Sequence, residues 1–196
     1  MNTKKNISGE GEIKSFSLLD NSNTALILID FQEKLIKGLG SKEILIKNIN
    51  KLIDTFYETD LEIYVTEQNP KKLGFTSDKL NLMRINKFEK MDFSCISCKG
   101  LIERLQSRDI KNIILCGVET HICILQSALE MMNIGFCVHV MIDGTTSRNE
   151  IDHTTGIRRM ETSGIIISSC ETAIFELCKT ATNSSFRKIS EIIKRN

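Results

Sequence analysis

The chain has 196 residues, enough to bury the core of a single domain. Its 26 basic and 25 acidic side chains leave a net charge of +1, so no surplus of charge attracts nucleic acid or an anionic membrane. No apolar run approaches the roughly 18 residues of a membrane span, and the polar start MNTKKNISGEGE lacks the apolar core of a signal peptide. We therefore expect a cytoplasmic protein whose partners are small molecules or other proteins, with no nucleic acid or membrane among them.

Seven cysteines are scattered along the chain, an odd number that does not suit the disulfide framework of a secreted scaffold. Several of them, such as Cys116 and Cys137, lie in apolar runs, where a free cysteine acts as a small buried hydrophobe. Residues 1–14 are polar and are expected to form a flexible lead. Residues 15–196 are expected to form one domain, because no linker or repeat interrupts them.

Short apolar runs rich in β-branched residues predict strands over residues 25–30, 61–66, 82–85, 112–116, 136–142 and 164–168. Helical spacing between and after them predicts helices near residues 44–56, 101–105, 120–132, 157–160 and 185–194. In the third of these helices, Ile122, Leu125, Leu129 and Met132 are predicted to form the apolar face. Most of the strands are nearly all apolar, which is typical of a parallel sheet covered on both faces. The predicted fold class is a three-layer α/β/α sandwich.

Reactive side chains follow three of the predicted strands. Asp30 closes the first apolar run, Lys90 follows the third, and Cys123 comes a few residues after the fourth. In an open parallel sheet, ligands bind beyond the carboxyl ends of the strands, so an acid, an ammonium group and a thiol are expected to meet at one sheet edge. Their proximity is a topological inference, because the three residues are far apart in the sequence.

Each of the three residues has a chemical role if they do meet. A thiol near the first turn of a helix feels the positive end of the helix dipole, and a neighbouring lysine adds to that effect, so Cys123 is expected to be a thiolate at neutral pH. Asp30 would carry a proton from the thiol to a leaving amine. Backbone N–H groups around residues 118–123 would hold the developing oxyanion, and the product would be an acyl-enzyme that water releases.

Plainer interpretations exist for each residue. An Asp after an apolar strand is often a helix cap or a turn residue, and Lys90 lies in a charged segment where it could be an ordinary solvated charge. His121 is two residues from Cys123, and residues two apart on a helix point to different sides, so it is not expected to act as a base for the thiol. His139, in a predicted strand, and His153, in a predicted helix, are expected to be structural.

Cys95 and Cys98 form a Cys-x-x-Cys pair, which is typical of redox sites or of half a zinc site. A structural zinc site needs a second pair, and the sequence has none. A redox motif is expected at a helix start after an early strand, which is not where this pair lies. Nucleotide binding is not indicated either, because the glycine-rich fingerprints are absent.

Three segments resemble, in order, the signatures of the isochorismatase-like cysteine hydrolases. They are Asp30-Phe31-Gln32, Lys90-Met91-Asp92-Phe93-Ser94 and Gly117-Val118-Glu119-Thr120-His121-Ile122-Cys123. Each motif is weak alone, but three in order at the expected strand ends are specific. The resemblance covers roughly residues 24–194, with further fits at residues 66–70, at Asp143 with Ser147 and Arg148, and at residues 168–171.

The resemblance implies a six-stranded, mostly parallel, Rossmann-like sheet and a catalytic triad of Asp30, Lys90 and Cys123. It also implies a cis peptide between Val118 and Glu119 that aims backbone amides at the oxyanion. The pocket residues carried over from the signatures are Gln32, Gln68 and Phe93. Family members that cleave the vinyl ether of isochorismate need no cysteine at this place, so Cys123 favours attack at a carbonyl or amidine-like carbon.

The resemblance also bears on metals, cofactors and assembly. Nicotinamidases of this family carry a metal site built from an Asp and histidines near the second strand, whereas residues 67–74 here contain no histidine. We therefore expect no metal and no cofactor. The family implies a homo-oligomer. The predicted function is hydrolysis of a C–N bond in a small amide-like substrate through an acyl-enzyme on Cys123, and the alternative is a non-catalytic oligomeric binding protein of the same fold.

Overall fold

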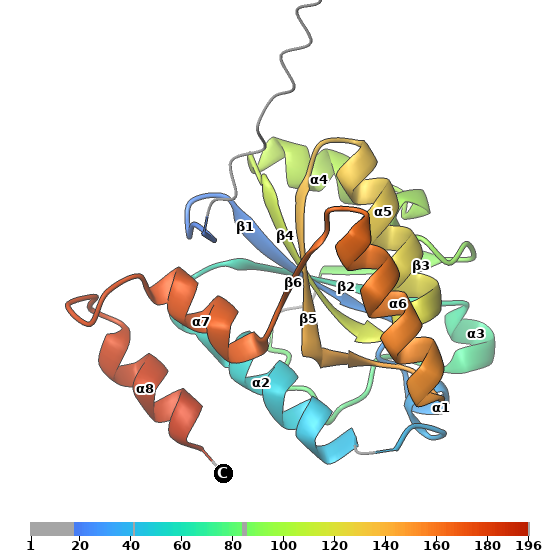
Figure 1. The fold of residues 1–196 in the computed structure, drawn as a ribbon, viewed down its shortest axis with the longest axis horizontal. Coiled ribbons are helices and arrows are strands. Elements are labelled where there is room, and N and C mark those ends of the chain that lie inside the picture. Colours follow the sequence, from blue (N-terminus) through green and yellow to red (C-terminus); the bar gives the residue numbers. More distant parts are fainter. Residues whose placement is uncertain (1–17, 41, 84–85, 196) are drawn as a thin grey trace, which may run out of the picture.

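Six parallel strands form one sheet in the computed structural model, which describes residues 18–40, 42–83 and 86–195 (Figure 1). The strand order is β3-β2-β1-β4-β5-β6. The strands are β1 (Thr24–Ile29), β2 (Glu62–Gln68), β3 (Asn86–Lys90), β4 (Asn112–Val118), β5 (Cys137–Thr146) and β6 (Ile166–Ser168). The predicted lead over residues 1–14 lies outside the described residues.

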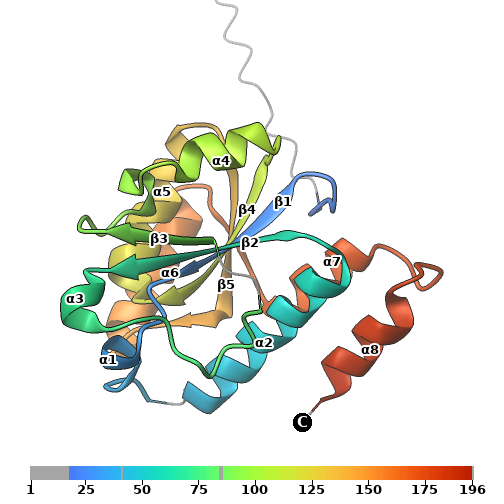
Figure 2. The same ribbon diagram turned by 180° about the vertical axis from the view of Figure 1, so that it is seen from behind.

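Helices cover both faces of this sheet, which confirms the predicted three-layer fold. Helices α2 (Lys42–Glu58), α7 (Cys170–Cys178) and α8 (Phe186–Lys194) pack on one face, and α4 (Leu101–Ser107), α5 (Leu125–Asn133) and α6 (Glu150–Thr162) pack on the other (Figures 1 and 2). Shorter elements are α1 (Glu33–Ile36), α3 (Pro70–Leu73), the 3₁₀ turn η1 (Cys95–Ser97) and the π-helical turn η2 (Thr120–Ile124). No helix within the described ranges is long and apolar enough to span a bilayer.

The central strand β1 explains why its sequence is continuously apolar. Leu26 and Leu28 point to the core beneath α2, whereas Ile27 and Ile29 point to the core beneath α4 and α5, and all four are fully buried. Successive side chains of a strand alternate between its faces, so a strand covered on both sides needs apolar residues at every position. The apolar run ends at Asp30, where the chain leaves the sheet.

The third strand was predicted over residues 82–85, of which residues 84 and 85 lie outside the described residues. Leu82 and Met83 lie outside any strand, and the strand is Asn86–Lys90, whose first four residues alternate between half-buried and exposed. It is an edge strand paired only with β2, so it has no need of a continuous apolar run. The apolar residues that precede β3 therefore predict the position of this strand wrongly.

The helix predicted over residues 120–132 is present, but its buried face is shifted by one residue. Leu125 is buried as predicted, but the other buried apolar residues of α5 are Ala128 and Met131, whereas Leu129 and Met132 are only half-buried. The first turn, η2, is π-helical, and a π turn holds more residues than an α turn. The extra residue in this turn changes which of the following side chains face the core. The spacing of a continuous α-helix, counted from Ile122, therefore predicts the wrong positions.

Candidate active site

The candidate site lies where the direction of the strand order reverses. β1 and β4 are neighbours in the sheet, but the chain leaves β1 toward β2 and leaves β4 toward β5. Such a switch point opens a crevice beyond the carboxyl ends of the two strands. Asp30 follows β1 and the turn η2 follows β4, so the acid and the thiol of the predicted triad follow two neighbouring strands at the same edge of the sheet.

Gly117 allows the ends of β1 and β4 to come close together. It pairs with Ile29, its φ angle is +120°, and a Cβ atom built on it would lie 2.0 Å from the carbonyl oxygen of Ile29. A side chain at this position would collide with the backbone of β1, so only glycine fits. The close approach brings the turn that carries Cys123 next to Asp30.

Asp30 is fully buried and held by bonds to neighbouring strands. Its φ angle of +49° is uncommon for a residue other than glycine, and its N–H donates to the carbonyl of Thr66 at 3.1 Å. The Thr66 hydroxyl donates to one carboxylate oxygen at 2.7 Å, and the Lys90 ammonium donates to the other at 2.6 Å. A positive φ costs on the order of 1–3 kcal/mol and persists only where the surroundings hold it, as these bonds do.

Lys90, the last residue of β3, reaches across the sheet edge as a fixed cation. Its side chain is fully buried, and Nζ donates to Asp30 at 2.6 Å, to Oε1 of Gln68 at 2.7 Å and to the carbonyl of Phe93 at 2.9 Å. These three short bonds match the three protons of an ammonium group. The charge is thus paired and hydrogen-bonded, as a buried charge must be, and the structure brings Lys90 and Asp30 together as the sequence predicts.

Cys123 lies in η2 with its side chain against this ion pair. The residue is 6% exposed, and its thiol lies close to the charges of both Asp30 and Lys90. Burial, followed by the negative charge of Asp30, raises the pKa of the Cys123 thiol to about 12, and the nearby Lys90 only partly opposes this. The expected resting thiolate is therefore wrong, because desolvation outweighs the lysine.

The two residues predicted beside the oxyanion are Val118, the last residue of β4, and Glu119, which directly precedes η2. The peptide bond between Val118 and Glu119 is cis. The carbonyl of Glu119 accepts the N–H groups of Ile122 and Ile124 at 3.1 and 3.3 Å, so these two amides are already used. The Glu119 carboxylate accepts the backbone N–H and the Nε–H of Arg148, both at 3.0 Å.

The three predicted pocket residues have different surroundings. Gln32 is fully buried, and its amide bonds to the backbone of Gln68 and to the carbonyl of Gly74, which leaves neither of its N–H groups for a substrate. Gln68 holds Lys90 with its oxygen and donates its N–H to the carbonyl of Met91 at 2.7 Å. The Phe93 side chain, by contrast, is 52% exposed. Of the three, Phe93 is the one accessible to a small molecule.

Two residues at the site lie in segments that resemble the family, but the sequence assigns neither of them a role of its own. Thr66 bonds the carboxylate of Asp30, and Gly117 permits the close approach of β1 and β4. A hydroxyl directly after the apolar residues Ile63, Tyr64 and Val65 is a signal for Thr66, because a buried hydroxyl needs a partner. Gly117 has a weaker signal, a glycine at the end of a strand, which often marks a close backbone approach.

Cys95 and Cys98 lie near Asp30 and Lys90, and two histidines form bonds at the turn that carries Cys123. Cys95 and Cys98 are buried, and burial raises the pKa of Cys95 to about 11 and that of Cys98 to about 12. His121 bonds to Ser147 at 2.9 Å and His153 to Thr120 at 2.9 Å. Within the described ranges, no three His, Cys, Asp or Glu side chains are grouped as ligands of a metal ion.

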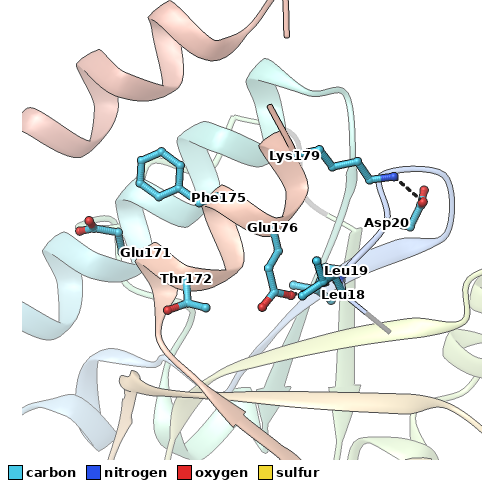
Figure 3. A pocket seen from close by; sticks show the side chains of 8 residues that line it. All are labelled: Leu18, Leu19, Asp20, Glu171, Thr172, Phe175, Glu176 and Lys179. Atoms are coloured by element: carbon cyan, nitrogen blue, oxygen red, sulfur yellow. Dashed lines mark hydrogen bonds and ion pairs between the residues drawn. The ribbon is translucent and has the colours of Figure 1, made fainter. Parts of the chain in front are cut away.

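A surface pocket of about 620 Å³ lies elsewhere, between α7 and the residues that precede β1 (Figure 3). Lys179 and Asp20 form an ion pair of 2.6 Å across it, and Glu176 accepts the N–H of Leu19 at 3.1 Å. None of Asp30, Lys90 and Cys123 lines this pocket. It is therefore separate from the candidate active site.

Comparisons with known proteins agree with this geometry. The Isochorismatase domain family matches residues 24–172. Isochorismatase domain-containing protein 2 of Xenopus laevis is 30% identical over 182 residues, which cover 92% of this chain and 88% of that protein. The structure of MAR1 ribonuclease from Caenorhabditis elegans superposes with a TM-score of 0.85 at 28% identity, covering 92% of this chain and 94% of the other.

A more distant structure shares the fold. The YcaC protein of Escherichia coli, described as an octameric hydrolase of unknown specificity, has a TM-score of 0.85 at 20% identity, covering 92% of this chain and 91% of the other. The family match spans most of the sheet and includes Asp30, Lys90 and Cys123. This chain therefore belongs to the isochorismatase domain family of hydrolases.

Proposed function

We propose that this protein is a metal-independent cysteine hydrolase that cleaves the C–N bond of a small amide-like substrate. Cys123 is the nucleophile, Asp30 the proton carrier and Lys90 the fixed cation that holds Asp30 in place. The observation that carries the proposal is the buried ion pair of 2.6 Å between Lys90 and Asp30, with the Cys123 thiol close to both charges. A nucleophile, a base and a group that orients the base are the parts that covalent catalysis needs.

The raised thiol pKa decides how the attack proceeds. With a pKa of about 12, only about one molecule in 10⁵ carries a free thiolate at pH 7, which corresponds to about 7 kcal/mol. A free thiolate intermediate is therefore disfavoured. We propose that the thiol proton moves to Asp30 while the sulfur–carbon bond forms, since Asp30 is the carboxylate close to the thiol.

The remaining steps use the same residues. The attack converts the amide carbonyl to an oxyanion, and the candidate donors are the backbone amides of Thr120, His121 and Cys123, because those of Ile122 and Ile124 already bond to Glu119. Asp30 then gives its proton to the leaving nitrogen, and the C–N bond breaks. Water attacks the acyl-enzyme as Asp30 takes a proton from it, and the carboxylic acid and the thiol are released.

The partners are proposals of the same kind. A small uncharged or weakly charged substrate suits a chain of net charge +1, whereas RNA would need a basic surface. The C. elegans relative is described as a ribonuclease, so an RNA oligonucleotide belongs among the compounds to be tested. The octameric E. coli structure supports a homo-oligomer here, which light scattering of the purified protein would measure.

The proposal is tested with a panel of small amides, carbamates and ureas together with the RNA oligonucleotide. We expect turnover of at least one amide-type compound by the parent protein and by a Cys98→Ala control, and none by Cys123→Ala. Hydrolysis by Cys123→Ala would overturn the mechanism. If the folded parent turns over nothing in the panel and Cys123 is no more reactive than Cys98, the alternative of a non-catalytic oligomeric binding protein gains support.

A further inference from the structure

The turn that carries Cys123 is held from the side of α6. Three consecutive residues at its start, Glu119, Thr120 and His121, each bond to a residue of the segment that leads into α6 or of α6 itself. Their partners are Arg148 (two bonds of 3.0 Å), His153 (2.9 Å) and Ser147 (2.9 Å), respectively. Helix α6 runs alongside α5, which continues from this turn (Figure 1). The position of η2 is thus tied to α6 by side-chain bonds just before the nucleophile.

A glycine in α6 makes the contact closer still. A Cβ atom on Gly156 would lie 3.1 Å from Cα of His121, 3.2 Å from its backbone N and 3.3 Å from the backbone carbon of Thr120. Gly156 is inside α6, where glycine costs roughly 0.5–1 kcal/mol relative to alanine, and its backbone conformation does not require glycine. The close approach of the turn is what explains a glycine at this position.

The two halves of the site are therefore supported separately. Asp30 and Lys90 are fixed by bonds to Thr66, Gln68 and Phe93, on the side of β2 and β3. The turn η2 is fixed by α6 and the segment before it. The alignment of the thiol with Asp30 depends on both supports, and a misplacement of 1 Å at a reacting atom can cost about 100-fold in rate.

We propose that Gly156, together with the bonds from Ser147, Arg148 and His153, forms a template that sets the position of Cys123 relative to Asp30. These are positioning residues, because they act through η2 and none of them needs to touch the substrate. The inference rests on the proposed function, since it assigns to α6 the placement of the nucleophile named there.

The test compares three glycine variants of the full chain. Gly156→Ala places a methyl group against the backbone of η2. In Gly144→Ala, which lies away from the turn, the new Cβ atom would lie 2.8 Å from the sulfur of Cys116 and 3.0 Å from that of Cys170. In Gly38→Ala, the new Cβ atom has no neighbour within 4 Å. Each variant is measured for thermal unfolding, for kcat and KM with an amide substrate found in the panel, and for the rate of iodoacetamide labelling of Cys123 by peptide mass spectrometry.

We expect Gly156→Ala to lower kcat roughly tenfold with KM near that of the parent, because a shift of a few tenths of an ångström misaligns the thiol. Labelling of Cys123 should become faster, since a loosened turn exposes a thiol that is now only 6% exposed. Gly38→Ala should match the parent, and Gly144→Ala should lose stability without a change in kcat. If Gly156→Ala matches Gly38→Ala, or changes only in proportion to lost stability as Gly144→Ala does, the inference is overturned.

A second pair of variants covers the case in which Gly156→Ala does not fold. Ser147→Ala removes the hydroxyl that bonds to His121, and Ser147→Thr keeps a hydroxyl. We expect kcat to fall in the first and to be retained in the second, and equal kcat in the two would contradict the inference. Failure of the proposed function is recognised separately, because Cys123→Ala would then retain turnover.

Discussion

Two short helical turns bring buried cysteines to the same edge of the sheet, η1 with Cys95 after β3 and η2 with Cys123 after β4. Burial raises the pKa of both thiols, to about 11 and about 12. The Cys95 thiol packs 4.0 Å from the sulfur of Met131 in the core, whereas the charge of Asp30 acts on the Cys123 thiol more strongly than any cause except burial. Both thiols are buried, and we infer that Cys123 is the candidate nucleophile because Asp30 can take its proton. Each prediction below tests that difference.

The largest effect is expected from Asp30→Asn, which removes the base and keeps the shape. Turnover should fall roughly 10²–10⁴-fold, the usual contribution of general acid–base catalysis. Iodoacetamide labelling of Cys123 should instead become faster, because the negative charge of Asp30 is one cause of the raised thiol pKa. The two rates, measured on the same preparation, should move in opposite directions. A parallel fall in both would indicate that Asp30 only supports the fold.

Lys90→Met should show how strongly the ion pair supports the region around η2. It leaves the Asp30 carboxylate buried without its partner, which costs about 3–5 kcal/mol of unfolding free energy. Cys123→Ala removes an uncharged group and should cost much less. Urea unfolding of the two variants beside the parent measures the contrast. Equal free energies of unfolding for the two variants would contradict a buried ion pair between Lys90 and Asp30.

The rate of labelling as a function of pH should distinguish the thiol of η2 from that of η1. A thiol with a pKa of about 12 gains thiolate roughly tenfold per pH unit below that value, so labelling of Cys123 should rise about 100-fold from pH 7 to pH 9. Cys95, which is 0% exposed, should remain unlabelled in the folded protein. Peptide mapping at each pH measures both. A plateau for Cys123 below pH 8 would show a low thiol pKa and restore the resting thiolate.

The smallest effect is expected from Ser127→Ala, which acts on η1. The Cys95 N–H donates to the buried Ser127 hydroxyl at 2.9 Å, and leaving this donor without a partner costs about 1–3 kcal/mol. We expect lower stability in thermal unfolding with turnover per folded molecule unchanged. A loss of turnover beyond the loss of stability would place η1 in the chemistry and weaken the contrast with η2.

The sequence predicts the central strands and the strand-end residues well, because buried parallel strands are apolar throughout and ligand-binding residues follow them. It fails at β3, an edge strand with alternating exposure, and at the face of α5, which the π turn rotates. Thr66, Gly117 and Gly156 could not be placed at the site by spacing. Their roles depend on contacts between segments that are distant in the chain, such as Gly117 with Ile29.

The central claim, that Cys123 is the nucleophile, is tested most directly by following inactivation and alkylation together. The parent protein is treated with iodoacetamide at pH 8, and samples are taken for turnover of the amide substrate and for peptide mass spectrometry. We expect the fraction of activity lost to equal the fraction of Cys123 alkylated at every time point. Activity that survives complete alkylation of Cys123, or activity lost while Cys123 is unmodified, would contradict the account.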